Sequence, residues 1–407
     1  MTGTRMRSPL LATIERVHEG GPHRIKDREK ARLYREICRG RSPTRKNMAR
    51  LLDIRPSSVS EAVQELVDDG LVEETQAQIR GRTGRPRLIL APRADRLVAI
   101  SLYTESRELK GVLVNLSGSV LAEVVRMVRP EARNREMSSV ILDFLLGLAP
   151  KVPPGSELIG ASLSLVGTVN ARTRTWVGAA RWPGLKNLDL SSLEQRLGLP
   201  VLLRRTNDTE LEYVLECSPE YARASVLLFH WGFGIGTAMS YRGTLLASSI
   251  GRFGEIGHTR IGPPSEAPCL CGSRGCLETE AALWALLPRL RRRLGDLPED
   301  EKELTPLLGN PRLLVLPEVE RALRAVQSAL FTLYRIFSPD AIMLSGPFPE
   351  NKGVFRRLAR DFSGSLPSYA RRAVELSVIP GGLRGCRLGG ANPLLRDALR
   401  RALRRRP

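Results

Sequence analysis

Long apolar stretches are missing from this sequence of 407 residues: no run of about 18 or more uncharged apolar residues occurs. We therefore expect no membrane-spanning helix. Residues 1–21 contain basic side chains but only a very short apolar segment, which argues against a secretory signal peptide. These absences predict a cytoplasmic protein.

Cysteine is also scarce, with six residues in the chain, but three of the six lie close together behind one histidine. Thiolates and imidazole are the ligands that zinc prefers, and four protein ligands make a closed, structural site. The prolines and glycines between them favour a loop. The alternative is that three reduced cysteines share this spacing by chance. The predicted zinc ligands are His258, Cys269, Cys271 and Cys276, and they favour a reducing compartment.

Acidic residues are too few to balance the basic ones: 43 Asp and Glu face 63 Lys and Arg, for a net charge of +20. Such an excess favours polyanions, chiefly nucleic acid. A compositional bias towards arginine explains it equally well. The segment 394–406 predicts an amphipathic, arginine-rich helix that packs on the body of the protein.

The first 92 residues have the pattern of a helix-turn-helix. Apolar spacing predicts three short helices, at residues 28–39, 44–54 and 56–69. Pro56 suits the first turn of the third helix, where an amide hydrogen has no intrahelical acceptor. A tight turn at 53–55 precedes this candidate recognition helix. A small helical domain that binds protein is the alternative.

Two strand-like segments, 71–75 and 87–92, flank a basic, glycine-rich hairpin that is typical of the wing of a winged helix. Small polar side chains early in the recognition helix can reach phosphates or base edges, and a glutamine can read a base. Arginines in the wing suit phosphates or the minor groove. The predicted DNA contacts are Ser57, Ser58, Ser60, Gln64, Arg82, Arg85 and Arg87.

Residues 93–407 alternate strand-like and helical segments, the pattern of an α/β protein. Three consecutive segments predict an antiparallel meander, at 97–103, 110–116 and 120–128. Two long apolar segments then run into glycine turns, at 158–170 and 224–240. We expect a body of two related lobes.

A loop at residues 254–278 carries a pattern that is specific to one family. Glu255, Gly257 and His258 match E-x-G-H, and the segment from Cys269 to Glu278 matches C-x-C-G-x-x-G-C-x-E. On these residues the chain resembles the ROK family (repressors, open reading frames and sugar kinases), over almost its whole length. The resemblance implies a two-lobed, actin-like ATPase body of the ribonuclease H-like class behind the winged helix-turn-helix.

The resemblance also implies a sugar site. Carboxylates and amides suit sugar hydroxyls, because each hydroxyl both donates and accepts a hydrogen bond. The family's Asn–Asp pair matches residues 207 and 208, and in a kinase Asp208 would be the general base; here it is a vestigial candidate. By itself, an Asn–Asp pair at a strand end is more often a turn. The implied sugar contacts are Asn207, Asp208, Glu255, His258 and Glu278.

The phosphate-binding segments depart from the kinase pattern. Where kinases have D-x-G-x-T, this chain has Ser101 in place of the metal-binding carboxylate and Tyr103 in place of a glycine. Phe233 replaces a hydroxyl donor in the second loop, and Pro347 replaces a glycine in the third. Because phosphoryl transfer depends on positioning the phosphates and neutralising their charge, we expect no kinase activity and no role for ATP.

These features favour a transcriptional regulator, a repressor in preference to an activator, whose body senses a sugar or sugar derivative. Its partner is double-stranded operator DNA, bound by a homodimer or homotetramer. Closure of the cleft between the lobes would rotate the paired winged helices. One alternative is an ATP-dependent, glucokinase-like sugar kinase that carries a DNA-binding domain. Another is a body that serves as a scaffold for a protein partner.

Overall fold

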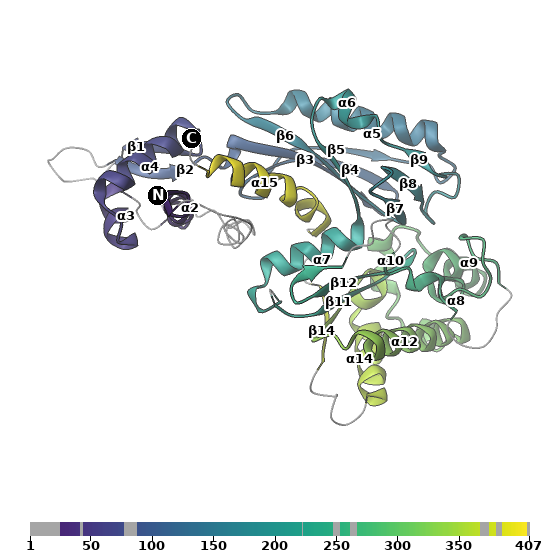
Figure 1. Ribbon diagram of the computed structural model, residues 1–407. Coiled ribbons are helices and arrows are strands. Elements are labelled where there is room, and N and C mark those ends of the chain that lie inside the picture. Colours follow the sequence, from purple (N-terminus) through teal and green to yellow (C-terminus); the bar gives the residue numbers. More distant parts are fainter. Residues whose placement is uncertain are drawn as a thin grey trace.

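The computed structural model describes residues 25–40, 44–76, 88–221, 223–246, 253–260, 267–366, 374–379 and 385–404. Figure 1 shows a small N-terminal part beside two larger lobes, each built on a mixed sheet. Within the described ranges, no helix is both long enough and apolar enough to cross a membrane.

The N-terminal part has the helices and strands that the sequence predicts. They are α2 (Ile25–Cys38), α3 (Arg45–Leu52), α4 (Pro56–Asp68), β1 (Val72–Gln76) and β2 (Leu88–Pro92). Asp53 turns the chain between α3 and α4 with a left-handed backbone, φ 54°, which aspartate tolerates better than most residues. β1 and β2 pair in antiparallel fashion. The tip of the wing, with Arg82, Arg85 and Arg87, lies outside the described residues.

The first lobe is a five-stranded sheet in the order β10-β6-β3-β4-β5. Its strands are β3 (Leu97–Glu105), β4 (Glu108–Asn115), β5 (Val120–Met127), β6 (Glu157–Leu165) and β10 (Val201–Arg205). The predicted meander β3-β4-β5 is antiparallel, whereas β6 and β10 run parallel to β3. The same lobe holds α5 (Asn134–Leu148), α6 (Leu193–Leu197) and a small sheet of β7 (Thr168–Asn170), β8 (Thr175–Gly178) and β9 (Leu188–Asp189).

The second lobe repeats this topology, with the sheet order β13-β12-β11-β14-β15. Its strands are β11 (Val226–Trp231), β12 (Ile235–Tyr241), β13 (Thr244–Leu245), β14 (Ala341–Ser345) and β15 (Glu375–Val378). Its helices are α8 (Leu277–Ala281), α9 (Leu283–Leu294), α10 (Glu301–Leu307), α11 (Pro311–Leu314), α12 (Pro317–Phe337), α13 (Pro347–Glu350) and α14 (Lys352–Ser365). In both sheets an antiparallel meander is followed by two parallel strands, so the expectation of two related lobes is confirmed.

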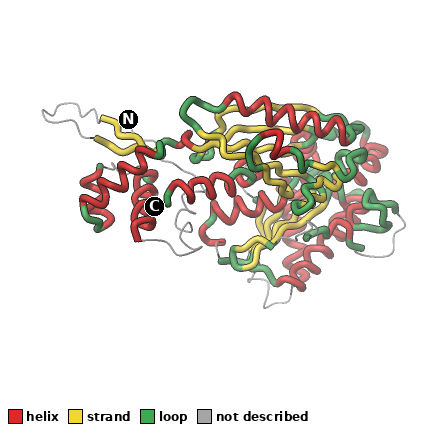
Figure 2. The backbone as a smooth tube through the Cα atoms, turned by 45° about the horizontal axis from the view of Figure 1, so that its top comes forward, coloured by secondary structure: helices red, strands yellow, loops and turns green. Residues whose placement is uncertain are grey.

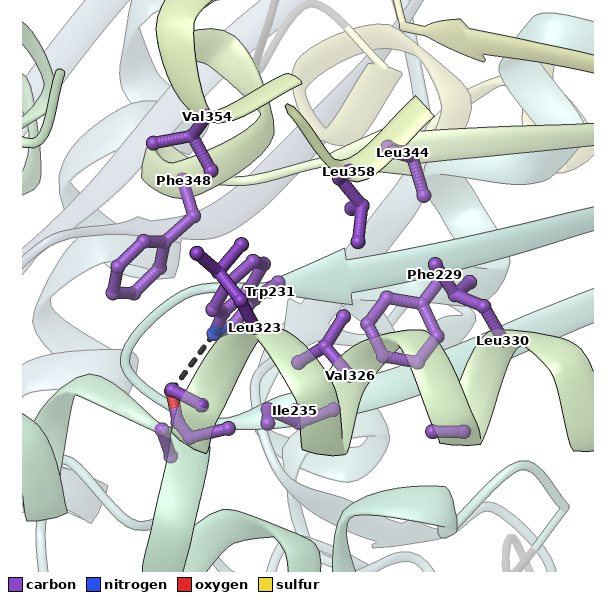
Figure 3. Packing of buried hydrophobic residues seen from close by; sticks show 14 of the residues in the cluster. Phe229, Trp231, Ile235, Leu323, Val326, Leu330, Leu344, Phe348, Val354 and Leu358 are labelled. Carbon is purple, nitrogen blue, oxygen red and sulfur yellow. Dashed lines mark hydrogen bonds between the residues drawn. The ribbon is translucent and has the colours of Figure 1, made fainter. Parts of the chain in front are cut away.

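The core of the second lobe fixes the turn that follows β11. The indole of Trp231 stacks on Phe348 with ring centroids 4.2 Å apart, and its Nε1–H donates to the carbonyl oxygen of Ala281 at 2.7 Å. Figure 3 shows this indole packed beside Leu323 and Val326 of α12. The glycine-rich turn after Trp231 therefore starts from a rigid strand end.

Two helices connect the distant parts of the chain. α7 (Thr206–Cys217) follows the last strand of the first lobe and leads to the second. α15 (Asn392–Ala402) is the last helix of the described residues, and Figures 1 and 2 show it between the N-terminal part and the lobes. Its apolar face includes Leu395 and Leu399, which share one continuous core with the N-terminal helices and the first sheet. The predicted packing of the C-terminal helix on the body is confirmed.

Lys30 of α2 lies at the junction of these parts and is 1% exposed. Its ammonium is 3.2 Å from the carboxylate of Glu65 and 2.9 Å from that of Asp69, both at the end of the recognition helix. It also donates to the carbonyl oxygen of Ala402 at 3.1 Å. Because a buried ammonium needs several acceptors, this one fixes α2, α4 and the end of α15 to one another.

Lys30→Ala should destabilise the protein, because it leaves two partly buried carboxylates without their cation. Removing one partner of a buried ion pair typically costs about 3–5 kcal/mol, and the partial exposure of Glu65 places the expected loss at about 3 kcal/mol. Urea unfolding followed by circular dichroism measures it. Lys46→Ala, an exposed site on α3, is the control. Equal stability of the two variants would contradict the role given to Lys30.

Candidate functional site

A cavity of about 960 Å³ lies between the two lobes. The first lobe contributes the ends of β3 and β6 and the loop after β8, and the second contributes the turn after β11 and the start of α10. Four of the five predicted sugar contacts line this cavity: Asn207, Glu255, His258 and Glu278. Segments far apart in the sequence thus place an amide, two carboxylates and an imidazole around one space.

Glu278 is 5% exposed, and its carboxylate stabilises the glycine turn between β11 and β12 through a hydrogen bond. Its Oε1 accepts from the backbone N–H of Ile235 at 2.7 Å, and its Oε2 accepts from the indole N–H of Trp284 at 3.0 Å. A Cβ on Gly236, the second residue of β12, would lie 2.6 Å from the amide nitrogen of Asn207. Glycine at position 236 therefore leaves room for Asn207 at the cavity wall.

Glu255 contacts groups of both lobes. Burial raises the pKa of its carboxyl, against the lowering effects of His258, of Arg205 and of a hydrogen bond from the Thr168 hydroxyl. Its Oε2 lies 3.7 Å from Nε2 of His258. Because Thr168 belongs to the first lobe and Glu255 to the second, this hydrogen bond connects the two lobes.

The four predicted metal ligands come together beside this cavity. One ligand atom from each of them lies within 4.8 Å of all the others: His258, Cys269, Cys271 and Cys276. The sulfurs of Cys271 and Cys276 are 3.7 Å apart, and Nδ1 of His258 is 3.6 Å from the sulfur of Cys269. A tetrahedron with metal–sulfur distances of about 2.3 Å has edges of about 3.8 Å, so the donor set fits a metal ion.

Asp208, the fifth predicted sugar contact, does not line the cavity. The guanidinium of Arg205 holds both of its carboxylate oxygens, with Nε to Oδ2 at 2.9 Å and Nη2 to Oδ1 at 2.6 Å. Arg205 also donates to the carbonyl oxygen of Phe253. Arg205 therefore holds both carboxylate oxygens of Asp208 outside the cavity lining.

The end of the cavity beside the glycine turn is lined by charged side chains. Glu301 of α10 accepts from the backbone N–H of Phe233 at 2.9 Å and from Nη2 of Arg181 at 3.0 Å. The guanidinium of Arg181 lies over the Phe233 ring, 4.1 Å from its centroid. Burial lowers the pKa of Arg181, although Glu301 raises it. Ion pairs of Lys302 with Glu105 also join the lobes here.

The segments that depart from the kinase phosphate-binding pattern contain both buried residues and residues that line the cavity. Ser101 and Tyr103 are buried in the first sheet, while Thr104 and Glu105 reach the cavity. Ser345 lies between two buried groups: its hydroxyl donates to Glu210 at 3.1 Å and is 3.0 Å from Nδ1 of His230. Burial raises the pKa of Glu210 to about 7 and lowers that of His230.

Several of these residues were not predicted from the sequence. Arg205 stands two positions before Asn207, so the sequence shows a charged residue close to the Asn–Asp pair. The sequence does not show that this residue binds Asp208. Arg181 and Glu301 lie 120 positions apart and meet only in the folded chain. No local motif marks either of them.

The recognition helix α4 presents a polar face to solvent. Ser57, Ser60 and Gln64 are exposed and Ser58 is half-buried, whereas the apolar residues between them face the core. Gln64 donates to Asp68 at 2.9 Å. Basic side chains flank this face: Arg55 precedes α4, and Lys46 and Arg50 are exposed on α3. These three residues were not predicted from the sequence as DNA contacts.

Two curated relatives share most of their length with this chain. The DNA-binding transcriptional repressor Mlc of Escherichia coli is 23% identical over 372 residues, covering 85% of this chain and 88% of the relative. The xylose repressor of Caldicellulosiruptor bescii is 25% identical over 286 residues, covering 68% and 69%. Both relatives are named as repressors, not as kinases.

Solved structures share the fold. A ROK family transcriptional regulator, a homologue of Mlc, has a TM-score of 0.67 at 22% identity and covers 93% of this chain and 98% of its own. A ROK family glucokinase from Streptomyces griseus, in complex with glucose and AMPPNP, has a TM-score of 0.57 at 20% identity and covers 74% and 99%. The expected fold, a winged helix-turn-helix with an actin-like, two-lobed body, is thereby confirmed.

The family model of the ROK family matches residues 106–387, which is more than half of the chain. This match includes the second lobe, most of the first lobe from β4 onwards and the His–Cys cluster. The chain therefore belongs to the ROK family.

Proposed function

We propose that this protein is a sugar-responsive transcriptional repressor. The observation that carries the proposal is a cavity lined by sugar-type hydrogen-bonding groups in a chain that also has an exposed, polar recognition helix. We divide the chain at residues 92 and 93 into a DNA-binding domain and a sensor. Its relatives Mlc and the xylose repressor, both transcriptional repressors by name, support this function and a cytoplasmic location.

The cavity favours a sugar as the effector. Asn207 offers both a donor and an acceptor, and Glu255 and Glu278 have lone pairs beyond those used in the protein. His258 presents Nε2 on the side of Glu255, while its Nδ1 faces the cysteines. Asp208 would join this set only after releasing Arg205, so we assign it a conditional role in sugar binding.

We assign DNA binding to Ser57, Ser58, Ser60 and Gln64 of α4 and to the wing arginines Arg82, Arg85 and Arg87. The exposed side chains of α4 support base and phosphate contacts in the major groove. Arg55, Lys46 and Arg50 would add phosphate contacts from the adjoining elements. Operator half-sites are commonly related by two-fold symmetry, which favours a homodimer or a homotetramer as the DNA-bound form.

Kinase activity is disfavoured by the charges in the cavity. A phosphoryl-transfer base must accept a proton, and Asp208 is paired with Arg205 through both oxygens. The turn that would cradle a phosphate holds the carboxylate of Glu301 on the amide of Phe233. We therefore propose that ATP is not a cofactor and that the sugar is bound without being phosphorylated.

A structural zinc ion is the metal that best suits the cluster. Three thiolates and one imidazole form a closed set, with no position left for substrate. His258, Cys269, Cys271 and Cys276 would hold the ion, which brings no redox chemistry and serves to fix the loop. Glu255, next to Nε2 of His258, would orient the imidazole as a carboxylate often does for a zinc-bound histidine.

A continuous set of contacts leads from the cavity to the recognition helix. α7 carries Asn207 in its first turn, and further along it Glu216 accepts from Arg396 of α15 at 2.9 Å and from Asn392. The end of α15 accepts the hydrogen bond from Lys30, which pairs with Asp69 beside α4. We propose that sugar binding moves α7 and α15 together and thereby reorients α4.

A sugar from a panel of hexoses, pentoses and N-acetylhexosamines should change DNA affinity by at least about fivefold, the lower range of allosteric coupling. Gel-shift titration against operator DNA obtained by in vitro selection measures this. Asn207→Ala should keep DNA binding but lose the response, because the amide that contacts the sugar is removed. Gln327→Ala, an amide on α12 outside the cavity, is the control. Binding that ignores every sugar and sugar phosphate would exclude the proposed sensing.

Cys271→Ser should lower the zinc content from roughly one ion per chain, because a hydroxyl is a weak substitute for a thiolate ligand. Elemental analysis of the purified protein measures it, and Cys217→Ser, an exposed cysteine outside the cluster, is the control. The sugar response of Cys271→Ser should weaken before DNA binding is lost. A wild-type protein that contains no stoichiometric zinc would rule out the assignment.

A further inference from the structure

Arg205 is a buried cation beside the predicted sugar contacts, and its side chain touches both lobes. It is the last residue of β10 and lines the cavity. Its guanidinium holds both carboxylate oxygens of Asp208, and Nη1 donates to the carbonyl oxygen of Phe253. The same Nη1 lies 3.9 Å from Oε1 of Glu255. Because Phe253 and Glu255 belong to the second lobe, this one side chain connects the two lobes.

The loop that carries Phe253 is anchored to the second lobe on its other side. The Phe253 ring contacts Phe337 of α12, with ring centroids 6.3 Å apart. The carbonyl oxygen of Gly254 accepts from the backbone N–H of Thr237 in β12 at 3.0 Å. Gly254 has φ 79°, and a Cβ there would overlap the carbonyl oxygen of Thr237. The loop therefore moves with the second lobe, and any shift of its contacts with Arg205 is a shift between the lobes.

The pairing with Arg205 leaves the predicted sugar site incomplete. Asp208, unlike the other four predicted contacts, does not line the cavity. A sugar hydroxyl at this end of the cavity therefore has to compete with the guanidinium for the Asp208 oxygens. When Asp208 turns to the sugar, the buried guanidinium loses two charge-assisted hydrogen bonds. Because a buried charge without acceptors is costly, another carboxylate must take their place.

Glu255 is the carboxylate that can replace Asp208. It is the nearest other carboxylate that pairs with Arg205, at 3.9 Å. Burial raises the pKa of its carboxyl, whereas the charges of His258 and Arg205 lower it. A carboxylate accepts several hydrogen bonds, so Glu255 can hold Arg205 and a sugar hydroxyl at the same time. The exchange would turn an ion pair within the segment 205–208 into an ion pair between the lobes.

We propose that Arg205 is the positioning residue that converts sugar binding into closure of the cavity: a sugar hydroxyl takes Asp208, and Arg205 exchanges Asp208 for Glu255. This inference rests on the proposed sugar sensing and names the ion pair that changes. The new pair draws the loop 253–258 towards the end of β10. The released Asp208 lies in the first turn of α7, so its movement shifts the helix that leads on to α15.

A crystal structure of the wild-type protein with the tightest-binding sugar of the panel tests the exchange directly. An oxygen of Asp208 should lie within about 3.0 Å of a sugar hydroxyl, and the guanidinium of Arg205 should be hydrogen-bonded to Glu255. A bound sugar beside an unchanged Arg205–Asp208 pair would overturn the proposal and leave sugar sensing intact. This measurement needs no variant to fold.

Arg205→Met keeps an apolar stem but removes the guanidinium, so Asp208 is free for the sugar from the start. Isothermal titration calorimetry on the full chain should show sugar binding about tenfold tighter than in wild type, the range of a hydrogen bond to a charged group. Gel shifts should show a DNA affinity that no longer changes with sugar, because the pair that closes the lobes is absent. Weaker sugar binding by Arg205→Met would contradict the exchange, since a residue that only supports the fold or contacts the sugar gives that result.

Two further variants isolate the role of Asp208. Arg205→Met combined with Asp208→Asn should lose the tenfold gain, because the gain comes from the freed carboxylate. Arg204→Met removes the preceding arginine of β10, which pairs with Glu212 outside the cavity lining, and should bind sugar as wild type does. A double variant that keeps the gain would overturn the proposal. If wild type binds no sugar at all, the proposed sensing fails and this inference fails with it.

Discussion

The buried ammonium of Lys30 is the interaction on which the arrangement of this molecule depends. A charge that is 1% exposed must find several acceptors, and here they come from the recognition helix and from the last turn of α15. Glu65 and Asp69 fix one side, and the carbonyl of Ala402 fixes the other. Moving α15 without moving α4 would leave this charge short of acceptors. The shared apolar core of the N-terminal helices, the first sheet and α15 strengthens the same constraint.

The cavity between the lobes divides into two chemically different halves. One half holds Asn207, Glu255 and His258, groups suited to hydroxyls and braced by the His–Cys loop. In the other half, Glu301 accepts a hydrogen bond from the turn after β11, and Arg181 donates to the same carboxylate. A kinase must leave that second half open to a nucleotide. Here that half is lined by Arg181, Phe233 and Glu301, and the Glu301 carboxylate is hydrogen-bonded to the amide of Phe233.

Local patterns in the sequence predicted the local features well. Pro56 and the apolar spacing after it located α4, because helix starts and buried faces depend on near neighbours. The same holds for the His–Cys cluster, whose four predicted metal ligands lie within 19 residues and come together as expected. Matching motifs also indicated the cavity residues Asn207 and Glu278.

Contacts between distant residues could not be predicted in this way. Lys30 and Ala402 are 372 positions apart, and only the folded chain shows that a helix end accepts from this lysine. The bond between Arg205 and Asp208 spans three positions, yet its geometry depends on how α7 leaves β10. These contacts nevertheless decide whether the carboxylate of Asp208 is turned towards Arg205 and whether α15 can move alone.

Hydrogen–deuterium exchange of the full chain, with and without the tightest-binding sugar or sugar phosphate, tests the connection between the cavity and the DNA-binding helices. We expect altered exchange at 206–217 in α7, at 392–402 in α15, and also at 25–38 and 56–68 in the DNA-binding helices. Changes confined to the cavity, with the exchange of α2 and α4 unaltered, would contradict the proposed connection between the sensor and the recognition helix.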